Sequence, residues 1–298
     1  MSLTPVPENL QRATLRLEFP PSYVVVGIYR LFTDKSLWEP AWVKCAHAVR
    51  RGAIVGSVWA LATFSIQRKF IEIFLANSPR VTGLSQHDTM FGFKVPFNIY
   101  TYGAIMLLGT QLTFILRFFL SRNLRITRDR VWAQTVSSRG KSADFFQPYV
   151  EEWNVPPKVE KESWIETAGK GWVSAFVIRR VLLTPFAVYP FIGALASAWF
   201  KALGTSKYLH RRYFEAKKMK NDQIAVFVEE RKWDYRTFGF TAALLEGLPI
   251  IGIVFEVSNR IGAAMWAYDL EKRQHYIGEQ KAAGRWAGSE AALRVKSL

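Results

Sequence analysis

The sequence predicts an all-α polytopic membrane protein with two long transmembrane helices and two half-penetrating helical hairpins. Three observations predict this fold class. Of the 298 residues, 50% are hydrophobic and 15% are aromatic, which is rich for a soluble domain. The runs 95–116 and 181–200 contain no charged residue, and each is about as long as a helix that crosses ~30 Å of hydrocarbon. Basic residues concentrate in 117–180 and 201–236, which favours the same membrane face for both segments.

The first predicted elements are an amphipathic helix over 23–40 and a transmembrane helix over 44–76. The segment 23–40 mixes aliphatic and aromatic residues with a few charges, so it can lie in the membrane interface and end before Pro40. An ordinary helix packed on the outside of the bundle is the alternative. The helix over 44–76 is marginal because its uncharged run covers only 52–67. It can cross if the flanking basic side chains snorkel to the interfaces.

The second transmembrane helix is predicted over 95–120 and is followed by a cytosolic loop over 121–170. This loop is long, has mixed charge and contains two adjacent prolines, which is typical of an irregular connection. The last segment, 273–298, is predicted to be a cytosolic tail. All of these elements belong to a single membrane domain over 1–298.

Two helical hairpins are predicted over 172–203 and 235–270, because both regions contain residues that interrupt helices. If both regions crossed fully, the basic segment 201–236 would lie outside, against the positive-inside rule. Proline removes a helix hydrogen bond, and a helix broken inside a bilayer needs protein or water to cover its backbone groups. A kinked full span is the alternative for each region. The predicted helix-breaking residues are Pro185, Pro190, Gly193, Gly247 and Pro249.

The second hairpin carries polar residues that an apolar helix would avoid: Glu246, Glu256, Asn259 and Arg260. Glu256 and Arg260 are four residues apart, the spacing at which a carboxylate and a guanidinium pair on one helical face. Pairing lowers the cost of a buried charge, which is ~3 kcal/mol in a membrane. These four residues are therefore candidates for a ligand or ion site. The alternative is that these residues form a structural contact between the two hairpins, and the spacing fits both interpretations.

A basic segment with interleaved aromatic residues follows the first hairpin. Near a membrane, such a cluster attracts anionic lipid headgroups at ~1 kcal/mol per basic residue. A solvated helix face explains the same pattern equally well. The net charge of +16 comes without a nucleic-acid-binding motif, so no nucleic acid partner is predicted. The candidate headgroup ligands are Lys207, Arg211, Arg212, Lys217 and Lys218.

The sequence contains no pattern of catalytic or metal-binding residues. The 4 histidines are scattered without metal-ligand spacing, and no phosphate loop, dinucleotide fingerprint or nucleophile elbow is present. We therefore expect neither a metal nor a cofactor, and a protein that is not an enzyme.

Several motifs resemble the family of etoposide-induced membrane proteins and CysZ-type sulfate permeases, most closely its fungal branch of outer-spore-wall and lipid-droplet proteins. The resemblance is carried by Gly27 with Leu37-Trp38 and Pro40, by the spacing of Pro185, Pro190 and Gly193, and by 210–272. It implies an amphipathic first helix, two long transmembrane helices, and two pairs of helices that enter half of the bilayer.

The resemblance implies an integral membrane protein of the endoplasmic reticulum or lipid droplet, with both termini cytosolic. We expect a non-enzymatic role that supports lipid or spore-wall assembly, with membrane lipids as partners. The alternative is a small-anion permease that uses Arg260 and the broken helix at 247–249. Small residues near Gly193 allow helices to approach closely, either within one chain or between two copies of it. A homo-oligomer is therefore one of two alternatives.

Overall fold

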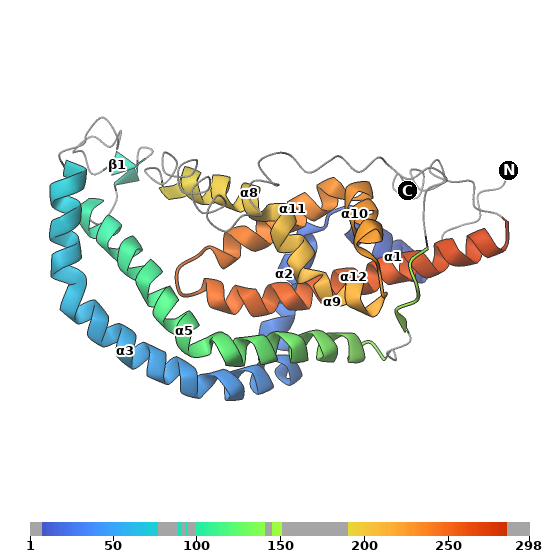
Figure 1. The fold of residues 1–298 in the computed structure, drawn as a ribbon, viewed down its shortest axis with the longest axis horizontal. Helices are drawn as coiled ribbons and strands as arrows, with labels where there is room; N and C mark the ends of the chain where they lie inside the picture. The colour runs from blue at the N-terminus through green and yellow to red at the C-terminus, as the bar shows by residue number, and fades with distance from the viewer. Residues whose placement is uncertain are drawn as a thin grey trace.

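The computed structural model describes residues 8–76, 89–90, 93–94, 99–140, 145–150 and 190–284, which are almost all helical. The helices are α1 (Glu8–Leu17), α2 (Pro21–Thr33), α3 (Lys35–Ala76), α5 (Ile99–Ser137), α8 (Pro190–Leu209), α9 (Arg211–Ala216), α10 (Asn221–Glu230), α11 (Lys232–Glu246) and α12 (Gly252–Ala282). Two short strands, β1 (Thr89–Met90) and β2 (Phe93–Lys94), form an antiparallel pair. Figure 1 shows α3 and α5 as two long, curved helices that lie side by side and partly enclose the shorter ones.

The junction between α2 and α3 explains why the predicted helix over 23–40 is two helices. Asp34 has an extended backbone, and its carboxylate accepts hydrogen bonds from the backbone N–H and the hydroxyl of Ser36, at 3.1 and 2.6 Å. This side-chain cap starts a new helix at Lys35. Pro40 therefore lies inside α3, near its beginning, instead of following the end of a helix.

The pair of α3 and α5 is held by small residues and by a polar contact. Gly56 of α3 lies against the side chain of Leu112 of α5, which brings the two backbones close together. The indole N–H of Trp59 and the amide of Gln67 both donate to the side-chain oxygen of Gln111, at 2.8 and 2.7 Å. A buried polar group needs such partners, so this contact fixes the register of the pair.

The helix α12 lies at the centre of the fold, where it contacts α1, α2, α5, α8 and α11. Its crossing with α2 is very close: a Cβ atom at Gly262 would overlap the carbonyl oxygen of Tyr23, and one at Gly27 would overlap that of Ser258. The largest core cluster joins aromatic side chains from six helices. Its fully buried rings are those of Tyr23, Tyr213, Phe227, Tyr235, Phe238 and Trp266.

The prediction of a polytopic membrane protein with two transmembrane helices and two half-penetrating hairpins is wrong. Among the residues that the structure describes, no helix is both long enough and apolar enough to cross a bilayer. The uncharged run of α3 is closed by basic pairs at 50–51 and 68–69, and that of α5 contains tyrosine, threonine and glutamine before Arg117. Several polar residues of α12, among them Glu256, Asn259 and Arg260, are buried within the helical core.

Other predicted boundaries also differ from those of the structure. The helix α5 continues to Ser137, through the first part of the predicted loop over 121–170, and α12 continues to Ala282, into the predicted tail. Trp132 and Val136 of the α5 extension pack in the core, and Gln274 and Ile277 of the α12 extension are buried. The first half of the predicted hairpin over 172–203, with Pro185, lies outside the described residues.

Candidate functional site

The predicted ion pair between Glu256 and Arg260 does not form. Glu256 instead forms ion pairs with two arginines of α5, Arg117 and Arg128. The distance from Nη1 of Arg128 to the Glu256 carboxylate is 3.2 Å. The carboxylate is almost buried, and two cations from one neighbouring helix satisfy it. The Glu256 carboxylate therefore binds α12 to α5.

Arg260 binds the end of α8. Its Nη1 donates to the backbone oxygens of Tyr208 and Leu209, at 3.1 and 2.8 Å, and its guanidinium lies 4.8 Å from the centre of the Tyr208 ring. The last carbonyls of a helix lack partners within the helix and carry partial negative charge, so a cation stabilises them. Burial lowers the pKa of Arg260 below its usual range. These contacts favour the structural alternative for Arg260.

Asn259 connects α12 to the end of α11. Its side-chain N–H₂ donates to the backbone oxygen of Ala242 at 3.1 Å and to the carboxylate of Glu246 at 2.9 Å. Burial raises the pKa of Glu246 to about 7, although the hydrogen bond from Asn259 favours the charged form. Glu246 is thus the member of the predicted set whose charge changes near neutral pH.

We expect the free energy of unfolding to fall by about 2 kcal/mol as the pH rises from 4.5 to 7, because of Glu246. The folded-state pKa lies above that of the unfolded chain, so the folded state holds a proton that the unfolded state has already lost. Above about pH 8, where Glu246 is ionised in both states, this contribution stays constant. Urea unfolding at several pH values measures it. In Glu246→Gln the decrease should shrink by that amount, and an unchanged pH profile would contradict the assignment.

The break between α11 and α12 lies over 247–251. Gly247 ends α11, and Ile250 has a φ of 62°, which is strained for a β-branched residue. The backbone N–H of Ile250 donates to the Thr113 hydroxyl of α5 at 2.7 Å, and Pro249 lies against Gly109. The break is therefore held by α5.

The described part of the first predicted hairpin, 190–203, belongs to the single helix α8. Pro190 begins α8, a position where proline is tolerated, and Gly193 lies within the first turn of that helix.

The candidate headgroup ligands divide into buried and exposed residues. Lys217 is fully buried and pairs with Glu271 at 2.7 Å. Arg211 and Arg212 are exposed and pair with Glu215, and Arg212 also pairs with Asp129. The side chains left on the surface for a headgroup without a carboxylate partner are those of Lys207 and Lys218.

Sequence reasoning missed the buried polar groups along the second half of α12. Besides Lys217, the carboxylate of Glu271 accepts hydrogen bonds from the Tyr213 hydroxyl at 3.2 Å and the backbone N–H of Gln147 at 2.8 Å. Asp269 accepts one from the hydroxyl of Tyr23 at 2.9 Å. The partners lie far away in the chain, so no local spacing pointed to them.

The polar core also contains His210. Its Nδ1 lies 2.7 Å from the hydroxyl of Tyr235, and its ring centre lies 4.3 Å from that of Trp266. Burial lowers the pKa of His210 to about 3, so the imidazole is neutral. Within the described ranges, no group of three histidine, cysteine or acidic side chains is placed to hold a metal ion.

The outside of the α3 and α5 pair exposes many large apolar side chains. The side chain of Leu61 is 85% exposed and that of Phe118 is 78% exposed. Large apolar side chains exposed in this number along two paired helices are candidates for contact with a partner or a membrane. We call this region the α3–α5 apolar surface and define it by its most exposed residues: Val43, Val58, Leu61, Ile66, Phe114 and Phe118.

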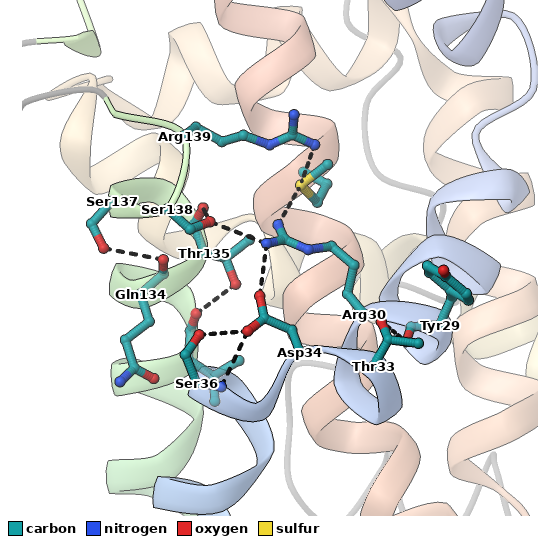
Figure 2. Close-up of polar contacts among 12 residues, drawn as sticks. Tyr29, Arg30, Thr33, Asp34, Ser36, Gln134, Thr135, Ser137, Ser138 and Arg139 are labelled. Atoms are coloured by element: carbon teal, nitrogen blue, oxygen red, sulfur yellow. Dashed lines mark hydrogen bonds and ion pairs between the residues drawn. The ribbon is translucent and has the colours of Figure 1, made fainter.

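A second surface feature lies where the ends of α2 and α5 meet α12 (Figure 2). Arg30 of α2 and Arg139, which follows α5, both donate to the sulfur of Met265, each at 3.2 Å. Arg30 also donates to Asp34 at 3.1 Å and to the Ser138 hydroxyl at 3.2 Å. Figure 2 shows the two guanidinium groups approaching that sulfur from opposite sides.

The comparisons with known proteins give one similarity. A stretch of 100 residues, 33% of this chain, is 36% identical to the outer spore wall protein RRT8 of Saccharomyces cerevisiae and covers 28% of that protein. The match thus spans less than a third of the relative. No protein-family model and no solved structure matches the chain. The similarity supports a link to the fungal outer spore wall proteins; it does not extend to the CysZ-type permeases.

Proposed function

We propose that this chain is a non-enzymatic component of fungal spore-wall assembly that works on a lipid surface. The α3–α5 apolar surface is the observation that carries the proposal. Its exposed aliphatic and phenyl side chains would insert among the acyl chains of a lipid layer, and each buried side chain contributes about 1.5–3 kcal/mol. We propose the endoplasmic reticulum or the lipid droplet as the compartment that holds this lipid surface.

Electrostatics support the same partner. Basic residues border the apolar stretch of α3 at 50–51 and 68–69, and α5 continues with exposed arginines such as Arg122 and Arg125. The chain carries a net charge of +16. Basic residues close to an anionic leaflet contribute about 1 kcal/mol each, so we expect anionic lipids to bind more tightly than neutral ones.

We do not propose a small-anion permease. That alternative needs Arg260 to meet a substrate, whereas its Nη1 donates to the carbonyls that end α8. It also needs a route across a bilayer, and none of the described helices could cross one.

The double variant Leu61→Ser/Phe118→Ser tests lipid binding. Removing two exposed apolar side chains costs roughly 3–6 kcal/mol of insertion energy, so binding should weaken at least a hundredfold. Flotation with phosphatidylcholine vesicles, with and without phosphatidylserine, measures this change. Leu15→Ser is the control, because Leu15 is 62% exposed but lies on α1. Equal binding by the wild type and the double variant would refute the proposal.

The link to the spore wall is tested separately. A fluorescently tagged chain, expressed in sporulating yeast, should accumulate where a tagged RRT8 does. A uniform distribution through the spore would contradict a wall-assembly role, whatever the vesicle result.

A further inference from the structure

We propose that Arg30 and Arg139 form a binding site for a phosphate group, either free phosphate or the phosphate monoester of a lipid headgroup. The site lies where α2, the end of α5 and α12 meet (Figure 2). This inference does not rest on the proposed function, because inorganic phosphate can be tested without a lipid surface.

The first argument is the acceptor that the two arginines share. Both guanidinium groups donate to the sulfur of Met265, each at 3.2 Å. A thioether sulfur is a weak, neutral acceptor, whereas a guanidinium has five N–H donors. Two cations held near one neutral atom repel each other, and a bound anion would remove this repulsion.

The second argument is the balance of charge around the site. Besides the two arginines, the ammonium of Lys272 lies 4.9 Å from the centre of the Tyr268 ring, and the guanidinium of Arg139 lies 5.6 Å from the same centre. Two carboxylates offset part of this charge: Asp34 pairs with Arg30, and Asp269, which accepts a hydrogen bond from Tyr23, lies near Arg139 and Lys272. The three cations still outnumber the two carboxylates.

The third argument is access and chemistry. Arg139 and Ser138 are exposed, and the side chain of Arg30 is partly exposed, so a ligand can reach all three. Arginine binds phosphate oxygens through paired N–H groups, and two arginines from different elements can bind different oxygens of one phosphate. The Ser138 hydroxyl accepts a hydrogen bond from Arg30 and donates one to the backbone oxygen of Thr135, so it orients Arg30 and leaves the phosphate to the two guanidinium groups. A doubly charged phosphate monoester fits this set better than a carboxylate, which has fewer oxygens.

The test compares Arg139→Gln with Arg130→Gln in the full chain. Arg130 is also exposed on the α5 side, so both variants lose one surface charge. Calorimetric titration with inorganic phosphate is run at physiological ionic strength, which screens distant charges. We expect Arg139→Gln to weaken phosphate binding about tenfold, since it removes charge-assisted hydrogen bonds. Arg130→Gln should bind as the wild type does.

A second arm distinguishes the source of the phosphate. Vesicles of phosphatidylcholine with phosphatidic acid are compared with phosphatidylcholine vesicles alone. If the site takes a headgroup, Arg139→Gln loses the preference for phosphatidic acid while Arg130→Gln keeps it. If it takes free phosphate only, Arg139→Gln weakens binding in the calorimetric arm, while both variants keep the vesicle preference of the wild type. Equal losses in both variants, or no binding of either probe by folded wild type, would overturn the inference.

Discussion

Gly262→Ala should lower the free energy of unfolding by about 3 kcal/mol, because the new methyl group meets the backbone of a neighbouring helix. The added Cβ would overlap the carbonyl oxygen of Tyr23 in α2. A backbone oxygen cannot rotate away as a side chain can, so α2 and α12 must separate. Alanine gains about 1 kcal/mol over glycine in a helix, which is too little to offset the clash. Urea unfolding followed by circular dichroism measures the change.

Gly204→Ala is the matched control for this prediction. Gly204 also lies within a helix, but a Cβ atom there meets nothing within 4 Å. The substitution should therefore stabilise the protein by about 0.5–1 kcal/mol. Equal stability of the two alanine variants would contradict the close crossing of α2 and α12.

Lys217→Met should be the other strongly destabilising change, at about 3–5 kcal/mol. The side chains of Lys217 and Glu271 are both fully buried, with 2.7 Å between Nζ and the carboxylate. Methionine fills a similar volume but leaves the carboxylate buried without its cation. The free energy of unfolding, from urea titration at pH 7, measures the loss.

Two further variants separate the buried charge from general damage. Lys218→Met removes the neighbouring, exposed lysine and should change stability by less than about 0.5 kcal/mol. The double variant Lys217→Met/Glu271→Gln should recover part of the loss, because no charge then remains buried. A Lys217→Met protein as stable as Lys218→Met would show that the pair does not contribute.

The candidate site shows which parts of such an arrangement local spacing can predict. Glu246, Glu256, Asn259 and Arg260 were selected because polar residues interrupt an apolar stretch, and the structure places all four among buried or partly buried contacts. The four-residue spacing of Glu256 and Arg260 predicted the wrong partner. On a surface helix the nearest opposite charge is on the next turn, but inside a bundle other helices offer closer groups.

The membrane prediction failed for a related reason. Sequences rich in apolar residues and bordered by basic ones describe both transmembrane helices and the long helices of this fold. Hydropathy reports how apolar a segment is, whereas its surroundings depend on packing. The pairing of α3 and α5 decides which apolar residues stay outside: Gly56 and Leu112 lie in the contact, whereas Leu61 and Phe118 remain exposed.

The sequence by itself determined that the chain is helical, that its helices are interrupted near 247–249, and that its charge is strongly basic, because these properties depend on composition and on neighbouring residues. Only the tertiary structure decided which buried charges pair, which lysine is internal, and that Arg30 meets Arg139. Those contacts join residues far apart in the chain. Their energies depend on burial and distance, which no local pattern of residues contains.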